Sequence, residues 1–287
     1  MASRSQVKNM AQEQAKAASF RVLHSGREIL LLPNVWDVAS ARLIEESGFK
    51  AAATSSAGIA FSLGYPDGQR ISREQMLAVI ARIAKAVRVP VTADVEAGYG
   101  KTPEDAGRTA RAVVEAGAVG MNLEDAIGDS PSVLVELPLQ LEKIRAVREM
   151  ASRLRVPLVL NARTDMYLLQ IGDPAERYDE TVRRLSAFRE AGADCVFAPG
   201  LRDAPTIGRL VADLKCPINI LAGPGSPSVP ELSKLGVARV SLGSATMRAT
   251  VGCLRRIAQE LKATGTYSNL EDAPSHAEMN RMMERKP

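Results

Sequence analysis

Short apolar runs alternate along the chain with longer amphipathic segments, from residue 29 to residue 242. Each run is too short and too uniformly apolar for a strand with one face in water, and this is typical of parallel strands covered on both faces. The predicted strands are residues 29–32, 50–54, 91–95, 119–123, 158–161, 195–198, 218–221 and 239–242. Amphipathic helices are predicted between them, and a further helix is predicted from about Gln6 to Ser25.

Glycine and proline mark the boundaries of these elements. Four helices are predicted to end on a glycine that accepts a left-handed backbone, at Gly48, Gly117, Gly192 and Gly236. Two strands start directly after a Val-Pro pair, where proline costs no hydrogen bond of the sheet.

Eight strand-helix units without a linker between them predict a (β/α)₈ TIM-type α/β barrel. An open doubly wound sheet is less favoured, because none of the eight strands has the polar character of an edge. We expect residues 1–287 to form a single domain, with a barrel core at about 20–261 and a helical tail at 262–287 that packs on a neighbouring subunit.

Composition and charge restrict the kinds of molecule that the protein is expected to bind. Hydrophobic residues make up 46% of the chain and charged residues 24%, as in ordinary globular proteins. The net charge of +4 is dispersed and aromatics make up only 4%, which argues against nucleic acid and agrees with a small anionic substrate. The three cysteines show neither the spacing of a metal site nor that of a disulfide framework. No apolar run reaches the ~20 residues of a membrane span, so a cytoplasmic protein is expected. A transit peptide at the alanine-rich N-terminus is the alternative.

Candidate chemistry lies at the carboxyl ends of the predicted strands, where the active sites of barrel enzymes are built. The side chains expected there include Trp36, Asp37, Ser55, Ser56, Asp94, Glu96, Glu124, Arg163 and Asn219. Carboxylates from neighbouring strands repel one another unless a cation lies among them, and oxygen ligands favour a hard cation. Asp94, Glu96 and Glu124 are therefore the predicted metal ligands, with Mg²⁺ as the metal and Mn²⁺ as its substitute.

Other interpretations of these residues remain open. Asp125 and Asp165 are interpreted as acids that cap the following helices. Arg163 is expected to bind a substrate carboxylate, with a salt bridge to a strand-end acid as the alternative. Only His24 and His276 are present, both away from the strand ends, so no nucleophile-histidine pair is predicted.

Several segments resemble the isocitrate lyase and phosphoenolpyruvate mutase superfamily, in the same order along about residues 20–261. They are PNVWDVASAR at 33–42, SSAG at 55–58, YPDG at 65–68, DVEAGYG at 94–100, NLED at 122–125 and NARTD at 161–165. The resemblance implies an α/β barrel, a homotetramer that exchanges its last helix between subunits, and Mg²⁺ that binds a 2-oxo or 2-hydroxy acid. It also implies that Ser55, Ser56 and Ala57 contact the substrate, that Asp94, Glu96 and Glu124 surround the metal, and that Arg163 and Asn219 bind substrate oxygens.

The chain departs from the superfamily pattern in three places, one of which is Ala198-Pro199-Gly200, where several members carry an acidic or His group after the sixth strand. Lyases of this superfamily carry a Lys-Lys-Cys-Gly-His segment soon after the Glu-Asp pair, whereas residues 126–137 contain no Cys or His. Glu96 replaces the more usual Asp, which lengthens that arm and favours a metal contact through water. The missing proton donor disfavours isocitrate-type cleavage.

The sequence thus predicts a Mg²⁺-dependent carbon-carbon lyase or decarboxylase that acts on a small 2-oxo acid through an enolate, with Asp94, Glu124 and Arg163 as its catalytic residues. The glycines after the last two strands favour an alternative, phosphoenolpyruvate mutase or phosphonate chemistry. A barrel that binds a metabolite without catalysis is the third interpretation.

Overall fold

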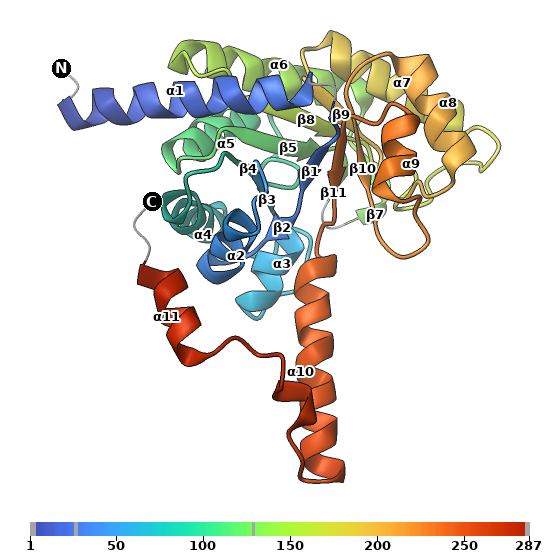
Figure 1. Ribbon diagram of the computed structural model, residues 1–287. Helices are drawn as coiled ribbons and strands as arrows, with labels where there is room; N and C mark the ends of the chain where they lie inside the picture. Colours follow the sequence, from blue (N-terminus) through green and yellow to red (C-terminus); the bar gives the residue numbers. More distant parts are fainter. Residues whose placement is uncertain (1–3, 26–27, 128–129, 285–287) are drawn as a thin grey trace.

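A computed structural model describes residues 4–25, 28–127 and 130–284. A closed barrel of parallel strands forms its centre (Figure 1). The barrel strands are β1 (Leu30–Leu32), β2 (Asn34–Val35), β3 (Ala52–Thr54), β4 (Val91–Asp94), β5 (Gly120–Glu124), β8 (Val159–Arg163), β9 (Cys195–Phe197), β10 (Ile218–Leu221) and β11 (Arg239–Ser241). The predicted α/β barrel is therefore confirmed.

The first predicted strand is split at Pro33 into β1 and β2. Along the sheet the order is β1-β11-β10-β9-β8-β5-β4-β3-β2, and every neighbouring pair is parallel. Because β1 and β2 are joined through Pro33, the two ends of this order meet and the barrel has eight staves. The Pro33 carbonyl still accepts a hydrogen bond from Ala53 N at 3.2 Å, although proline has no N–H to donate in return.

Helices cover the outside of the barrel, and one helix closes its floor. The outer helices are α2 (Val38–Glu46), α3 (Ser56–Ser62), α4 (Arg73–Ala86), α5 (Pro103–Glu115), α6 (Leu137–Leu154), α7 (Arg177–Glu190), α8 (Ala204–Leu214) and α9 (Val229–Lys234). The predicted N-terminal helix is α1 (Arg4–His24), whose buried Phe20 and His24 lie at the amino ends of the strands. Phe20 approaches Gly120 so closely that a Cβ there would lie 2.7 Å from its ring.

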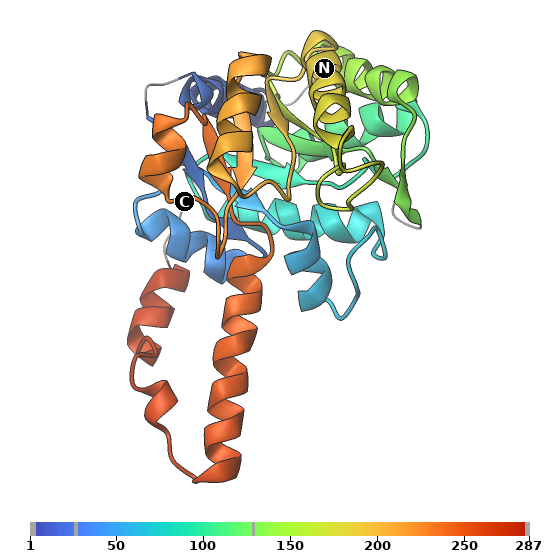
Figure 2. The same ribbon diagram turned by 90° about the vertical axis from the view of Figure 1, so that its right-hand side faces the viewer.

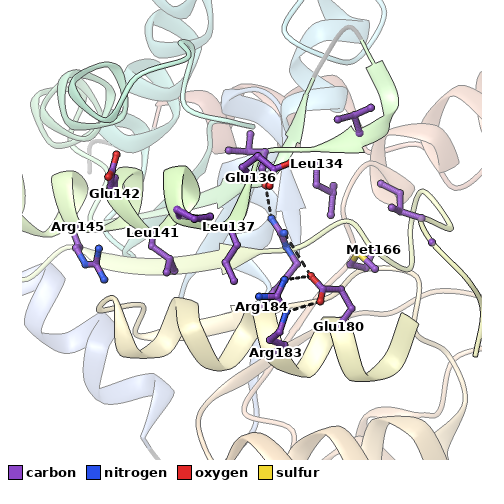
Figure 3. Close-up of a pocket in the computed structure, with 15 residues that line it drawn as sticks. Leu134, Glu136, Leu137, Leu141, Glu142, Arg145, Met166, Glu180, Arg183 and Arg184 are labelled. Carbon is purple, nitrogen blue, oxygen red and sulfur yellow. Dashed lines mark hydrogen bonds and ion pairs between the residues drawn. The ribbon is translucent and has the colours of Figure 1, made fainter. Parts of the chain in front are cut away.

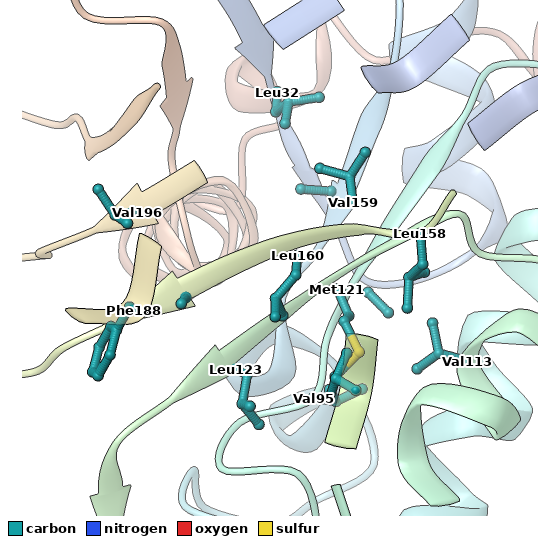
Figure 4. Packing of buried hydrophobic residues seen from close by; sticks show 14 of the residues in the cluster. Leu32, Val95, Val113, Met121, Leu123, Leu158, Val159, Leu160, Phe188 and Val196 are labelled. Atoms are coloured by element: carbon teal, nitrogen blue, oxygen red, sulfur yellow. The ribbon is translucent and has the colours of Figure 1, made fainter. Parts of the chain in front are cut away.

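The core between strands and helices is apolar. Met121, Leu123 and Leu160 from β5 and β8 belong to one buried cluster with Val113 of α5 and Phe188 of α7, which lie on either side of them in Figure 4. All four glycines predicted to end helices have a left-handed backbone, with φ between 84° and 113°. The helix-strand turns were therefore predicted correctly.

Two parts of the fold lie outside the barrel. β6 (Ala126–Ile127) and β7 (Ser130–Leu134) form an antiparallel hairpin after β5. The long helix α10 (Ala245–Ala263) projects away from the barrel, and the chain then returns through η1 (Ser268–Leu270) to α11 (His276–Glu284), which packs on α2 (Figures 1 and 2). In the described part of the chain, no helix has both the length and the apolar character that a membrane span requires.

Candidate active site

Asp94, the last residue of β4, is held from two sides. Its Oδ2 accepts hydrogen bonds from the backbone N–H and the hydroxyl of Ser56, at 3.0 and 2.8 Å. Its Oδ1 lies 3.5 Å from the Nδ2 of Asn122, which is paired with it in the register of β4 and β5. The carboxylate is buried, and the first residue of α3 fixes its orientation.

Glu96 follows two residues later in an unusual backbone conformation. Its φ is 51°, in the left-handed region that side chains other than glycine rarely adopt, and it is buried. Tyr99 donates its hydroxyl to Glu96 Oε1 at 3.3 Å. Burial and the charges of Asp94 and Asp67 raise the pKa of Glu96 to about 8. Glu96 is therefore protonated at neutral pH unless a positive charge joins it.

The guanidinium group of Arg163 supplies a positive charge beside Glu124. The Nη1 of Arg163 lies 2.8 Å from Glu124 Oε2, and the Arg163 fork binds both oxygens of Asp165. Burial raises the pKa of Glu124 well above its ordinary value, and the charge of Arg163 opposes this. Burial alone would lower the pKa of Arg163, but Glu124 and Asp165 more than reverse this. The alternative expected from the sequence, a salt bridge of Arg163 to a strand-end acid, is thus observed.

The donor set of this cluster agrees with a hard cation bound partly through water. Asp94, Glu96 and Glu124 are all buried oxygen donors, and Asp94 and Glu96 each raise the pKa of Glu124. Among the residues that the structure describes, no three His, Cys, Asp or Glu side chains lie close enough to hold an ion by themselves. Mg²⁺ characteristically keeps several waters and takes one or two carboxylates directly, so the cluster suits this ion.

The helix-capping interpretation of Asp125 and Asp165 is wrong. The N-cap residues of α6 and α7 are Glu136 and Glu176, well after both aspartates. Asp125 is instead a fully buried acid whose Oδ2 lies 2.8 Å from Arg184 Nε, while its Oδ1 accepts the backbone N–H of Asp165 at 3.0 Å. The fold brings Asp125 next to the buried Arg184 and Asp165 next to the partly buried Arg163, which the local sequence does not reveal.

Other predicted site residues have mainly local contacts. Asp37 caps α2, since its Oδ1 accepts the backbone N–H of Ser40 at 2.7 Å. Ser55 caps α3 through the N–H of Gly58 at 3.1 Å.

Trp36, Ala57 and Asn219 differ in their burial. Trp36 is half-buried, and its Cβ lies 3.2 Å from the position that a Cβ on Gly58 would take. Ala57 is buried on α3. Asn219 is fully buried, and its Nδ2 donates to Ser241 Oγ at 3.0 Å, so in this structure it binds within the barrel.

The structure adds two residues to the cluster that strand-end positions did not assign to it. Asp67 is exposed but lies near Asp94 and Arg163, and partial desolvation together with the charge of Asp94 raises its pKa. Asn122 joins Asp94 to Asn161, whose Nδ2 donates to Asn122 Oδ1 at 2.8 Å. Both belong to the segments that carry the family resemblance, at 65–68 and 122–125, and that resemblance was the available signal.

A separate pocket of about 740 Å³ lies between α6 and α7 (Figure 3). Leu137, Leu141 and Met166 supply part of its apolar lining. Arg184 lies at its wall and donates to the Val135 carbonyl at 2.7 Å. The carboxylate cluster does not line this pocket. Arg184, which does line it, also contacts Asp125 at the end of a barrel strand.

Comparison with known proteins places these features in a family. The family model described as phosphoenolpyruvate phosphomutase matches residues 20–262. An oxaloacetate decarboxylase of Ectopseudomonas mendocina is 30% identical over 254 residues, covering 83% of this chain and 83% of the relative. The crystal structure of a putative lyase/mutase from Burkholderia cenocepacia J2315 has a TM-score of 0.90 and 39% identity, covering 96% of this chain and 98% of the other. A structure of oxaloacetate acetylhydrolase in complex with oxalate has a TM-score of 0.83 and 29% identity, covering 93% of each chain.

Proposed function

Because the chain belongs to the isocitrate lyase and phosphoenolpyruvate mutase superfamily and is a lyase of that type, we propose that it is a Mg²⁺-dependent enzyme that breaks a carbon-carbon bond in a small 2-oxo acid. The crowding of Asp94, Glu96 and Glu124 carries this proposal. Burial and the charge of Asp94 raise the pKa of Glu96, and burial together with the charges of Asp94 and Glu96 raises that of Glu124, so the cluster favours the binding of a cation.

The residues of the cluster have different roles in the proposed reaction. Asp94, fixed by Ser56, and the longer arms of Glu96 and Glu124 would hold the cation directly or through water. The bound cation supplies a Lewis acid for the charge that develops on the 2-oxo oxygen. Arg163 uses one N–H for Glu124 and two for Asp165, and the remaining N–H groups on its two Nη atoms are donors for a substrate carboxylate.

Oxaloacetate is the substrate to test first. Two relatives are described as acting on it, a decarboxylase and an acetylhydrolase. Residues 126–137 of this chain lack a Cys or His that could deliver a proton during cleavage. Decarboxylation needs no acid to begin, because carbon dioxide leaves while the electron pair moves toward the 2-oxo group, so this reaction suits the site better than isocitrate-type cleavage.

The purified protein with Mg²⁺ should convert oxaloacetate or a substituted analogue to the decarboxylated acid, measured by coupled detection of the product. Asp94→Ala should abolish the enzymatic rate above the rate of Mg²⁺ alone, and an equal rate for the variant would contradict the metal assignment. Phosphorus NMR with candidate phosphonates tests the mutase alternative. Calorimetric binding of oxalate without turnover of any 2-oxo acid would favour the non-catalytic barrel.

We further propose that the chain assembles into a homotetramer in which the C-terminal helical region contacts a second copy. In the described part of the chain α10 has no buried residue and exposes Val251, Leu254 and Leu261. Apolar side chains on a projecting helix favour a protein partner. Light scattering after size exclusion should report four copies, and Leu254→Glu should reduce that number.

A further inference from the structure

Lys143 is a buried cation that the proposed chemistry does not use. It lies on α6, 1% exposed, and its Nζ donates to the carbonyls of Ala97 at 2.6 Å and Gly100 at 3.3 Å. Burial of an ammonium group on neutral acceptors is costly. Burial accordingly lowers the pKa of Lys143, while the charges of Asp105 and Glu124 oppose the shift. The cost of burying Lys143 indicates that its ammonium group has a role at this position.

The two carbonyls belong to the turn that carries Glu96, which contains an unusual concentration of left-handed backbone. Glu96, Gly98 and Tyr99 have φ values of 51°, 90° and 53°. Two of these three residues bear a side chain, for which this conformation is unfavourable. The turn therefore needs contacts from its surroundings to keep this shape.

Buried side-chain donors of the neighbouring helices supply those contacts. Besides the two bonds from Lys143, Thr109 of α5 donates to the Gly98 carbonyl at 2.7 Å. Packing alone does not confine this side of the turn, because Ala97 and Gly100 line a cavity of about 530 Å³ together with Lys143. Backbone hydrogen bonds from Glu124 N to the Glu96 carbonyl at 3.0 Å and from Gly98 N to the Val95 carbonyl at 2.9 Å hold the start of the turn. The carbonyls of Ala97 and Gly100 are bound by Lys143.

We propose that Lys143 is a positioning residue: its ammonium group binds the Ala97 and Gly100 carbonyls and so holds the Glu96–Tyr99 turn in the conformation in which Glu96 joins the carboxylate cluster. The functional consequence rests on the proposed metal-dependent activity, but the effect on the turn does not. Methionine has nearly the length of lysine and no donor, so Lys143→Met removes the two bonds while largely filling the same space.

Two readouts test the proposal. In the metal-free protein, amide hydrogen exchange of residues 96–100 should become roughly tenfold faster in Lys143→Met, while exchange in β5 and β8 stays unchanged. Mn²⁺ affinity, followed by electron paramagnetic resonance, should fall roughly tenfold or more, as for other residues that orient a metal ligand. Loss of activity at low Mn²⁺ should be largely recovered at saturating Mn²⁺.

Lys101→Met is the matched control, since Lys101 is an exposed lysine next to the same turn, and it should change neither readout. Lys143→Met with wild-type exchange at residues 96–100 and Mn²⁺ affinity within about twofold would overturn the proposal. If Lys143→Met does not fold, Lys143→Gln, which is shorter and uncharged, decides: faster exchange at residues 96–100 supports the proposal, and unchanged exchange overturns it. A wild-type protein that binds no Mn²⁺ would contradict the proposed function, while the exchange experiment would still test Lys143.

Discussion

Both carboxylate oxygens of Asp165 bind the guanidinium of Arg163, at 2.6 Å from Nε and 3.0 Å from Nη2. This two-point contact fixes the plane of the guanidinium group. Glu124, which forms a salt bridge with Nη1, cannot define that plane by a single contact. Asp165 therefore determines where the remaining N–H groups of Arg163 point.

Asp165→Asn should misalign Arg163 without removing its charge. One acceptor of the pair becomes an amide NH₂ group, which faces the guanidinium unfavourably. A hydrogen bond between charged groups contributes about 1.5–3 kcal/mol, so kcat/KM for the 2-oxo acid should fall about 10- to 100-fold. Steady-state kinetics at saturating Mg²⁺ checks this. Asp203→Asn, which alters only the N-cap of α8, should leave kcat/KM unchanged.

The raised pKa of Glu96 should make the metal-free protein less stable as the pH rises. The folded state keeps a proton on Glu96 up to pH about 8, whereas the unfolded chain releases it near its ordinary value of 4.5. Between these values the folded state binds more protons, so the free energy of unfolding should decrease by roughly 1 kcal/mol per pH unit from this group.

Glu96→Gln removes that proton and should remove this contribution to the slope. Urea unfolding of both proteins without metal at about pH 5 and about pH 7.5 measures the difference. The variant should also bind Mg²⁺ more weakly and gain less stability from it. Equal slopes for wild type and variant would contradict the assigned pKa.

Arg183 and Arg184 are neighbours in sequence, but their substitution should destabilise the protein to very different extents. Arg184 pairs with Asp125, which is fully buried, so Arg184→Met leaves an unpaired buried charge and should cost about 3–5 kcal/mol. The side chain of Arg183 is 59% exposed in its pair with Glu180, and Arg183→Met should cost less than about 1 kcal/mol. Chemical unfolding checks both, and adding Asp125→Asn to Arg184→Met should recover part of the loss.

Gly120→Ala should disturb the floor of the barrel. The added Cβ would lie 2.7 Å from the Phe20 ring and 2.8 Å from Thr92 Oγ1, and such overpacking costs about 1–3 kcal/mol. Gly223→Ala is the control, because no atom lies within 4 Å of its added Cβ. Equal midpoints of denaturant unfolding for the two variants would contradict the role of α1 as a closely packed floor.

The fold could be predicted from the sequence because its signals are local and repeated. Eight apolar runs gave the eight staves, and residues such as Gly48 and Gly117 marked the turns with positive φ. The hairpin of β6 and β7 was not predicted, since a strand containing Ser130 and Pro131 has no apolar run. The break at Pro33 was also missed, because both of its halves look like one continuous strand.

The candidate site was only partly predictable. Strand ends placed Asp94, Glu124 and Arg163 correctly near one another, because parallel strands end at the same face of the barrel. The roles of Asp125 and Lys143 depend on helices distant in sequence, which no local pattern reveals. Contacts between residues so far apart in sequence can be identified only in the folded structure.

The pairing of β1 with β11, which closes the barrel, sets an order of events during synthesis. β1 completes its pairing only with β11, so Leu30 must wait for Arg239 to be made. At about 5–20 residues per second, that interval lasts roughly 10 to 40 s. During that interval the edge of the first strand that faces β11 has no partner strand, whereas the finished barrel leaves no such edge exposed.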